Sequence, residues 1–352
     1  MNMIKRVIIV ICIVFLGTGV VYAQDVEPGS IVERIQERGE LICGVNWALP
    51  GFGVGETDDA ISRFLEVPEG FDVDICRAVA AAILGDADAV RYIPLAAADR
   101  PIALATGQVD MISRNTTWTL TRNTQWRAIF GPTTFYDGQG IMVHGESGLS
   151  TLEDLSGEPI CVAAGTTTEL NMREQLEIRG LDANLISETD TPTAFESFEN
   201  GICTAFTTDL SGLASFKASA DNGDSYIILD IVLSKEPLGP LSPDSDPRFA
   251  EIIAWTVWGL IQAEEFGITS ENVATFRDSE NQAIRRFLGT GTESSGDFLG
   301  IPNDFMFQVI SQVGNYGEIF ERHLGRSTPL GLDRGLNALW TDGGLLYSPP
   351  FR

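Results

Sequence analysis

The feature that most constrains this chain is a rhythm of short apolar segments that alternate with helical patterns. Residues 41–45 read LICGV, and residues 90–95 have the same apolar, β-rich character, as buried strands do. Between them, residues 71–84 carry apolar side chains at helical spacing, and Asp72 or Asp74 can cap the start of that helix. Strands that alternate with helices in this way predict a parallel α/β sheet.

The same rhythm continues along the chain and restarts after residue 140. Further strands are expected at residues 109–113, 160–163, 184–187, 204–208 and 226–229. Further helices are expected at residues 100–106, 193–199, 210–219, 248–264, 281–288 and 305–322, and one more helix follows the loop at residues 165–169 and ends at about residue 179. This arrangement predicts two similar α/β units rather than one continuous sheet.

Two extended segments can connect the units. Residues 140–143 and 231–235 both have strand character and can both cross between them. We therefore expect two α/β lobes joined by a two-segment hinge. The first lobe would be discontinuous and carry a C-terminal helical extension (residues 24–140 and 235–352), and the second lobe would be inserted into it (residues 141–234).

The N-terminus has the pattern of a secretory signal peptide, assigned to residues 1–23. Lys5 and Arg6 precede an unbroken apolar run, Val7–Leu16, and small residues lead to a cleavage site after Ala23. A membrane anchor is the alternative, but ten strongly apolar residues are too few to cross a hydrocarbon layer of about 30 Å. The mature chain is therefore expected to be exported to the periplasm, with no membrane insertion after cleavage.

Composition excludes several classes of function. Lys and Arg total 23 against 49 Asp and Glu, a formal charge of −26, which disfavours nucleic acid and anionic membrane surfaces as partners. The only histidines are His144 and His323, so most histidine-based zinc sites are excluded, and we predict no metal and no cofactor. No GxSxG, HExxH or phosphate-binding GxxxxGK[ST] motif occurs, so no catalytic residue is predicted.

Four cysteines remain after signal removal: Cys43, Cys76, Cys161 and Cys203. An even number in an exported protein predicts disulfides, and three connectivities are possible. We favour Cys43–Cys76 and Cys161–Cys203, because each pair then falls within one α/β unit, whereas pairing across units would lock their relative motion. Metal binding is disfavoured because no CxxC spacing occurs, and four buried free thiols remain an alternative.

Two hydroxyl-rich clusters follow strands, where α/β sheets bind ligands. The first is the segment 113–122 (SRNTTWTLTR), in which Arg122, or alternatively Arg114, can hold a carboxylate with hydroxyl groups around it. The second is the segment 165–169 (GTTTE), expected at a helix N-terminus that favours an anion. Simple helix capping by Thr166 explains the second cluster equally well.

An aspartate follows another strand of the second unit. Asp209 can cap the helix expected at residues 210–219, which is the commoner role, or it can receive a cation. An arginine on one unit, facing a helix terminus and an aspartate on the other, suits a zwitterion. Such an arrangement matches the carboxylate and ammonium groups of an α-amino acid.

Several longer sequence segments extend these motifs. They are residues 70–74 (GFDVD), 109–112 (VDMI), 113–119 (SRNTTWT), 136–140 (YDGQG), 234–240 (SKEPLGP), 314–320 (GNYGEIF), 334–340 (RGLNALW), and a T-x-T-x-x-R pattern from Thr117 to Arg122. With these segments the mature chain resembles the periplasmic amino-acid-binding proteins of polar-amino-acid ABC transporters, solute-binding protein family 3, and within it the general L-amino-acid-binding subgroup. The resemblance covers nearly all of the mature chain.

The resemblance implies a type II periplasmic-binding-protein fold, a broad range of L-amino-acid ligands, membrane permease subunits as partners, and a monomer. It also implies a binding site. Arg122 would bind the α-carboxylate beside Thr117 and Asn115, Thr166 and Thr167 would add donors from the second lobe, Asp209 would bind the ammonium group, and Asn46 and Trp47 would lie near the ligand side chain.

Two other function classes fit the same fold. One is an amino-acid-sensing module, although the chain shows no output domain. The other is a periplasmic dehydratase acting on a cyclic amino acid, for which Glu169 or Asp137 can be nominated as acid or base. We favour a transport protein that is not an enzyme, and we expect its lobes to close on the ligand.

Overall fold

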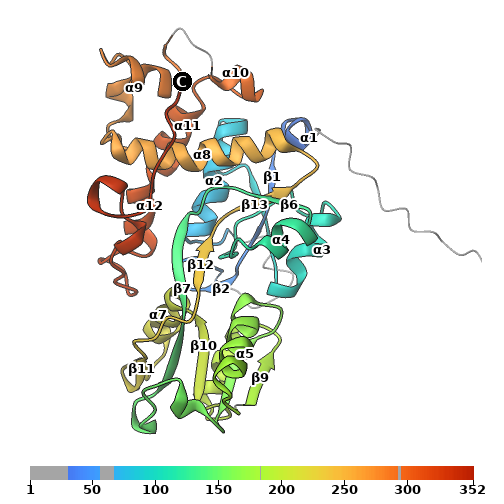
Figure 1. Cartoon of the computed structure of the whole chain (residues 1–352). Coiled ribbons are helices and arrows are strands. Elements are labelled where there is room, and N and C mark those ends of the chain that lie inside the picture. The colour runs from blue at the N-terminus through green and yellow to red at the C-terminus, as the bar shows by residue number, and fades with distance from the viewer. Residues whose placement is uncertain (1–30, 56–66, 183, 292–294) are drawn as a thin grey trace, which may run out of the picture.

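The computed structural model describes residues 31–55, 67–182, 184–291 and 295–352, which form two α/β lobes arranged end to end (Figure 1). The expected signal peptide, residues 1–23, and its cleavage site lie outside the described residues. Within the described part of the chain, no helix is both long enough and apolar enough to cross a membrane.

The first lobe contains a five-stranded sheet with the order β4-β1-β5-β13-β6. Its strands are β4 (Val90–Pro94), β1 (Leu41–Val45), β5 (Met111–Ile112), β13 (Leu241–Pro243) and β6 (Ala128–Phe130), with a small β2–β3 pair (Ala48–Leu49, Gly53–Val54) beside it. Strand β1 runs parallel to β4 and β5, as the alternating pattern predicted, whereas β13 pairs antiparallel with both β5 and β6. The sheet is mixed because the returning chain adds β13 in the opposite direction.

The second lobe contains the strand order β11-β7-β10-β8-β9. Its strands are β11 (Tyr226–Ile228), β7 (Phe135–His144), β10 (Ala205–Asp209), β8 (Pro159–Ala163) and β9 (Asn184–Glu188), and its helices are α5 (Thr167–Arg179), α6 (Thr191–Glu199) and α7 (Leu210–Ser219). Strands β8, β9 and β10 are parallel, so the helices that follow β8, β9 and β10 begin at one edge of the sheet. Strand β7 pairs antiparallel with β10, and β11 pairs antiparallel with β7, so β11 again runs in the direction of β10.

The long strand β7 and the short strand β12 (Lys235–Leu238) connect the two sheets as an antiparallel pair. The pairing runs from Phe135 to Gly138, whereas Gly140 already pairs with Thr208 of β10 inside the second sheet. The chain therefore crosses between the lobes before residues 140–143, where the sequence predicted the crossing. The crossing segment and the sheet strand are both parts of one unbroken strand, β7. The division at residues 140/141 and 234/235 stays a proposal.

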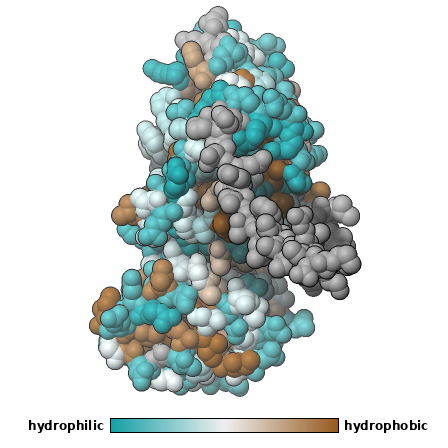
Figure 2. Space-filling model, turned by 90° about the vertical axis from the view of Figure 1, so that its right-hand side faces the viewer, coloured by the Kyte–Doolittle hydropathy of each residue, from teal (hydrophilic) through white to brown (hydrophobic). Residues whose placement is uncertain are grey.

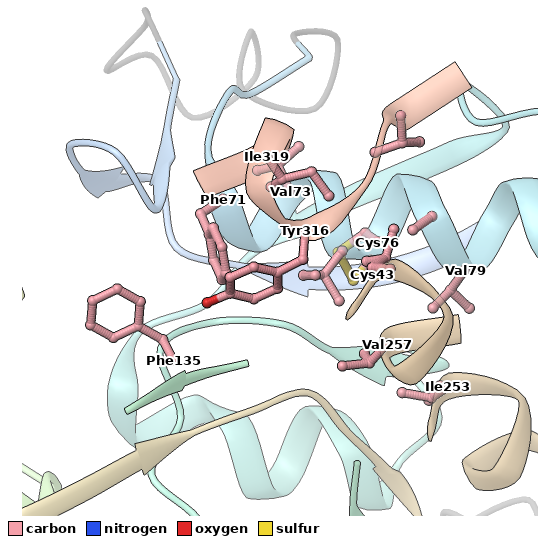
Figure 3. Close-up of a cluster of buried hydrophobic side chains, with 14 of the residues drawn as sticks. Cys43, Phe71, Val73, Cys76, Val79, Phe135, Ile253, Val257, Tyr316 and Ile319 are labelled. Atoms are coloured by element: carbon pink, nitrogen blue, oxygen red, sulfur yellow. A yellow bond between two sulfur atoms is a disulfide. The ribbon is translucent and has the colours of Figure 1, made fainter. Parts of the chain in front are cut away.

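Each lobe has its own disulfide, as predicted. Cys43 of β1 is bonded to Cys76 of α2 (Phe71–Leu84), with Cα atoms 6.2 Å apart (Figure 3). Cys161 of β8 is bonded to Cys203, with Cα atoms 5.7 Å apart. The bonds join residues 33 and 42 positions apart, and closing such loops stabilises a fold by about 3–4 kcal/mol in the loop-entropy account.

The remaining helices all belong to the first lobe and its C-terminal extension, at the top of Figure 1. They are α1 (Ile31–Arg38), α3 (Arg100–Ala105), α4 (Leu120–Gln125), α8 (Pro247–Glu265), α9 (Gln282–Phe287), α10 (Ser295–Leu299), α11 (Phe305–Val313) and α12 (Tyr316–His323). The single helix predicted at residues 305–322 is wrong. Gly314 has a φ of 94°, and Asn315 caps a new helix together with Glu318.

Aromatic side chains join this extension to the start of α2. Phe71 contacts Phe135 and Tyr316 edge to face, and the Tyr316 hydroxyl donates to the Thr134 carbonyl over 2.7 Å (Figure 3). The buried side chains of α8, α11 and α12 enlarge the core beside α2.

The surface of the lower lobe carries more apolar residues than the upper part on the face shown in Figure 2. The second lobe buries apolar side chains on both faces of its sheet, with Phe195, Phe198 and Phe206 on one face and a smaller cluster around Ile160 and Met172 on the other.

Candidate functional site

A small cavity lies between the two lobes. The first lobe lines it with residues from α3, α4 and the segment after β5, and the second lobe lines it with the N-terminal ends of α5, α6 and α7. The lining residues are Ala97, Arg100, Arg114, Asn115, Thr117, Arg122, Thr166, Thr167, Thr168, Thr191, Thr208 and Asp209. Six of the eight ligand-binding residues expected from the sequence thus meet at one place.

A buried aspartate holds the turn after β5 in place. Asp72 lies in the first turn of α2 but caps nothing there, because the N-cap is Gly70 without a side-chain hydrogen bond. Its carboxylate accepts from the Asn115 backbone N–H over 2.6 Å and from the Ser113 hydroxyl over 3.3 Å. Asn115 adopts a positive φ of 29°, an unusual conformation for a residue other than glycine, and this carboxylate stabilises it.

Burial raises the pKa of Asp72 to about 6, although its two hydrogen bonds and the nearby Arg114 oppose the shift. The predicted helix-capping role of Asp72 or Asp74 is therefore wrong. Asp74 instead contacts Arg77, Arg322 and His323.

Arg122 reaches the cavity from α4. Its Nη1 donates to the Thr117 carbonyl over 2.9 Å, and its guanidinium carbon lies 5.1 Å from the centre of the Trp126 ring. Burial lowers the pKa of Arg122, while the negative charges of Glu236 and Asp209 raise it. The arginine is thus anchored through one nitrogen, and its remaining donors are available to an anion in the cavity.

The hydroxyl cluster of the second lobe has a mixed role. Thr166 is the N-cap of α5: its hydroxyl accepts from the Glu169 N–H over 3.1 Å and donates to the Ala163 carbonyl over 2.7 Å. The capping interpretation is therefore confirmed for the Thr166 side chain. The Thr167 hydroxyl donates to Glu236 over 3.1 Å. What this segment can offer to an anion is the set of free backbone N–H groups in the first turn of α5.

Asp209 occupies the N-cap position of α7 but makes no side-chain capping bond. Asp137 of β7 takes that role, because its carboxylate accepts from both the N–H and the hydroxyl of Ser211. The Asp209 carboxylate is thereby left to face the cavity. Burial raises its pKa well above the ordinary value, and repulsion from Asp137 and Glu236 adds to the shift, whereas Arg122 opposes it. A cation bound beside Asp209 would relieve this repulsion.

The two residues nominated as an acid or base both serve structural roles. Asp137 also accepts from the Gly138 N–H over 2.8 Å, and burial raises its pKa to about 6. Glu169 accepts from the Gly165 N–H, from the Ser187 hydroxyl and from Arg173 one turn further along α5. Among the described residues, no group of three His, Cys, Asp or Glu side chains is arranged to hold a metal ion.

The two residues expected near the ligand side chain lie behind the cavity lining. Asn46 donates to the Asn115 side-chain oxygen over 3.1 Å and so reaches the site through Asn115. Trp47 is buried, and its indole lies against Gly55, away from the cavity. The direction of each side chain depends on how the segment after β1 folds back through the β2–β3 pair.

Two more arginines complete the lining. Arg114, expected as the alternative to Arg122 for holding a carboxylate, is buried, with only 6% of the residue accessible. Arg100 was missed altogether. It lies in the first turn of a short helix that belongs to no motif, and only the expected position of that helix after a strand could have drawn attention to it.

The lobes contact each other on both sides of the cavity. The Thr117 hydroxyl of the first lobe lies 3.3 Å from the Thr167 hydroxyl of the second, and the Ser215 hydroxyl of α7 donates to the Pro50 carbonyl over 2.9 Å. The interior space open to the centre of a water-sized molecule is only about 20 Å³, enough for about one water. Little free space therefore remains between the lobes at this place.

Comparison with known proteins finds relatives over nearly the whole chain. The family model of bacterial extracellular solute-binding proteins, family 3, matches residues 63–326. The chain is 45% identical to the general L-amino acid-binding periplasmic protein AapJ of Rhizobium johnstonii, with 92% of this chain and 93% of that protein covered. It is 43% identical to the glutamate/glutamine/aspartate/asparagine-binding protein BztA of Rhodobacter capsulatus, with 92% and 94% covered.

A solved structure shows the same similarity in three dimensions. An ABC transporter periplasmic binding protein from Brucella ovis, with glutathione bound, matches with a TM-score of 0.86 and 41% identity. The match covers 91% of this chain and 99% of that one. The C-terminal helices are therefore shared with a known binding protein and are not an addition peculiar to this chain.

Proposed function

The chain belongs to the bacterial extracellular solute-binding proteins of family 3, and we propose that it captures L-amino acids of several kinds in the periplasm and delivers them to an ABC transporter permease. Its fold is the two-lobed, type II periplasmic-binding-protein fold that the sequence predicted. In this proposal residues 1–23 direct export and the mature protein acts as a monomer.

The observation that carries this proposal is the pairing of Arg122 and Asp209 across one cavity. The guanidinium comes from the first lobe and the carboxylate from the second, and neither has an ion-pair partner among the described residues. Isolated buried charges are costly, so the arrangement favours a ligand that carries both opposite charges. The α-carboxylate and α-ammonium groups of an amino acid supply them whatever the side chain is.

Relatives support this ligand class. The names of AapJ and BztA describe amino-acid binding, in the first case without restriction to one side chain. Glutathione is a second candidate, because the similar Brucella ovis protein holds it and its glutamyl end has free α-amino and α-carboxylate groups. Delivery to a permease is preferred over sensing, since family members of this kind serve transporters. The close relatives named here are binding proteins rather than enzymes.

Calorimetric titration of the purified protein with the twenty amino acids and glutathione tests the proposal. Arg122→Met and Asp209→Ala should each weaken binding by about 2–5 kcal/mol for small, acidic and amide ligands alike, because both read atoms common to all of them. Matched controls are Arg127→Met and Asp333→Ala, whose parent side chains are largely exposed. If no ligand binds the parent protein, amino-acid capture is wrong. If Arg122→Met binds normally and Arg114→Met does not, the α-carboxylate belongs to Arg114.

The closed cavity also implies motion about the β7–β12 connection. Ligand-free protein should populate an open form, because the Thr117–Thr167 contact blocks entry in the closed one. Small-angle scattering should therefore give a smaller radius of gyration with saturating ligand than without it. An unchanged radius would contradict the hinge proposal and leave amino-acid binding to be judged by the titrations.

A further inference from the structure

The strand β12, which lies where the two lobes join, carries a buried carboxylate that the proposed site does not use (Figure 1). Glu236 and Leu238 occupy the inward-facing positions of this strand, and only 1% of Glu236 is accessible. An apolar residue is usual at such a position, because burying a carboxylate is costly unless donors surround it. Within the described residues Glu236 has no ion-pair partner, so its hydrogen bonds have to account for its burial.

Three side chains donate to Glu236, and two of them belong to α5. The Thr167 hydroxyl donates to Oε2 over 3.1 Å, and the Asn171 amide donates to Oε1 over 2.8 Å. The Ser234 hydroxyl also donates to Oε1. Thr167 and Asn171 are four residues apart and therefore lie on one face of the helix. A single carboxylate thus holds the beginning of α5 against the connecting strand, through hydrogen bonds that its charge strengthens.

The same strand supports the arginine of the first lobe. The Trp118 N–H donates over 2.8 Å to the carbonyl of Pro237, the residue next to Glu236. Thr117, one residue earlier, anchors Arg122 through its carbonyl. Adjacent residues of β12 therefore hold the turn that anchors Arg122 and the helix whose first turn faces the cavity from the other lobe.

A chain of hydrogen bonds links Glu236 to the contact between the lobes. The hydroxyl oxygens of Thr117 and Thr167 are 3.3 Å apart. A hydroxyl group has one proton, and the Thr167 proton is directed to Glu236, so the Thr117 hydroxyl is the donor between the lobes. Burial lowers the pKa of Arg122, and the negative charge of Glu236 opposes this shift. The carboxylate thus sets the direction of the interlobe hydrogen bond and favours the charged form of Arg122.

The position of α5 matters because two lobes have to reach one ligand group. In the proposed function, Arg122 of the first lobe and the free N–H groups of α5 meet at the α-carboxylate. These N–H groups exist as long as the helix does, but their direction relative to Arg122 depends on how α5 is held. The bonds of Thr166 stay within the second lobe, whereas those of Glu236 reach the connecting strand. Donors that are already in place spare the ligand the cost of ordering them.

We propose that Glu236 is a positioning residue for amino-acid binding, which orients the first turn of α5 so that its N–H groups and Arg122 meet at the α-carboxylate of the ligand. The inference rests on the proposed function. Because the α-carboxylate is common to all amino acids, loss of Glu236 should weaken every ligand by the same factor and leave the preference among ligands unchanged. A residue that only stabilised β12 would change the melting temperature but not the affinity of the folded protein.

Calorimetric titration with L-glutamate, L-glutamine and L-alanine tests this role. Glu236→Ala should weaken the binding of each ligand by about tenfold or more, the loss expected when a buried hydrogen bond to a charged group is removed. Glu236→Gln keeps an acceptor oxygen for α5 and should retain most of the affinity. Glu153→Ala is the matched control, because it removes a largely exposed carboxylate of the second lobe, and it should change nothing.

A double-mutant cycle with Thr167→Val tests the route of the effect. If Glu236 acts through Thr167, the two changes together should weaken binding clearly less than the product of their separate effects. Losses that simply multiply would contradict the hydrogen-bond chain. Thermal melting identifies any variant that fails to fold. If Glu236→Ala does not fold, the combined variant Thr167→Val and Asn171→Leu releases α5 from the strand instead, and normal affinity in that variant would overturn the proposal.

The remaining outcomes separate the two proposals. If the parent protein binds no amino acid, the proposed function is wrong. If the parent binds amino acids and folded Glu236→Ala binds them equally well, only the positioning role is wrong. A loss confined to one of the three ligands would show that Glu236 affects the ligand side chain, which also overturns the role proposed here.

Discussion

The two lobes present different chemistry to the same cavity. The first lobe supplies charged side chains, Arg100, Arg114 and Arg122, each held by a neutral oxygen acceptor. The second lobe supplies the N-terminal ends of α5, α6 and α7 and one carboxylate, Asp209. Side chains keep their direction only while their buried partners remain, whereas the N–H groups of a helix end persist as long as the helix does. The first face should therefore be the more sensitive to substitution.

The lobes also differ in how they are stabilised. The C-terminal helices α11 and α12 pack on α2 and enlarge the core around the first-lobe disulfide. The second-lobe disulfide lies among the aromatic side chains on one face of its sheet, which include Phe198 and Phe206. Each lobe has a single disulfide of similar loop length. Unequal responses to disulfide removal would therefore report the difference between the cores.

The largest expected effect is on stability. Replacing Cys161 and Cys203 together by alanine, or Cys43 and Cys76 together, should each lower the free energy of unfolding by about 3–4 kcal/mol. The loop-entropy account gives nearly equal losses for the two pairs, so a clearly greater loss for one pair would show that the core of that lobe compensates less. Denaturant unfolding of the two double variants measures both losses, and a loss well below about 3 kcal/mol for either pair would contradict the loop-entropy expectation.

A smaller loss is expected when the support of the first-lobe face is removed. Asp72→Ala should destabilise the protein by about 1–3 kcal/mol, since the buried Asn115 N–H loses its acceptor. Ligand affinity should fall with it, because Asn115 and Arg114 belong to the turn that Asp72 holds. Asp72→Asn keeps an acceptor oxygen and is the matched control. Normal affinity in folded Asp72→Ala would show that the turn needs no such support.

The second-lobe face should tolerate the corresponding change. Thr166→Ala removes the N-cap of α5 and should cost about 1 kcal/mol of stability. Binding should change little, because the backbone N–H groups of the first turn remain. Thr166→Ser, which keeps the hydroxyl, is the control. A loss of affinity in Thr166→Ala as large as that in Asp72→Ala would refute the distinction between the two faces.

The smallest expected effect is a pH dependence of stability. Asp72 and Asp137 have pKa values raised to about 6 by burial, so the folded state binds their protons more tightly than the unfolded chain does. The stability linked to these protons is complete below about pH 4 and is lost as the pH rises through about 6. Asp72→Asn and Asp137→Asn should therefore each reduce the gain in melting temperature, about 2–4 °C, on going from about pH 7.5 to about pH 5. Scanning calorimetry that finds the same gain in both variants would show that other groups cause it.

Much of the fold was predictable because its signals are local. Alternating apolar patterns placed most strands and helices, and Gly85 ends α2 in the left-handed conformation expected of a C-cap. The disulfide pairing followed from the order of the elements, since Cys43 and Cys76 fall on a strand and the next helix of one unit. The break at Gly314 was missed because the apolar periodicity of residues 305–322 continues across it.

The site was predictable only in part. Arg122 and Asp209 follow strands of different units, and parallel strands place their carboxyl ends at one edge of a sheet, so their meeting could be inferred before the structure was known. The sequence alone therefore indicated the two-lobed α/β architecture and the disulfide within each lobe, and it placed Arg122 and Asp209 on units that the structure brings together at one cavity. It also indicated Thr166 and its capping role correctly.

Only the tertiary structure decided which other charged residues line the cavity between the lobes. Arg100 carries no motif, Arg114 could have faced solvent, and Trp47 turns away from the cavity although its neighbour Asn46 reaches the site through Asn115. Asp209 is available because Asp137, more than seventy residues earlier, caps α7 in its place. These outcomes depend on contacts between segments far apart in the chain, and no local pattern encodes the direction of a side chain that a distant partner holds.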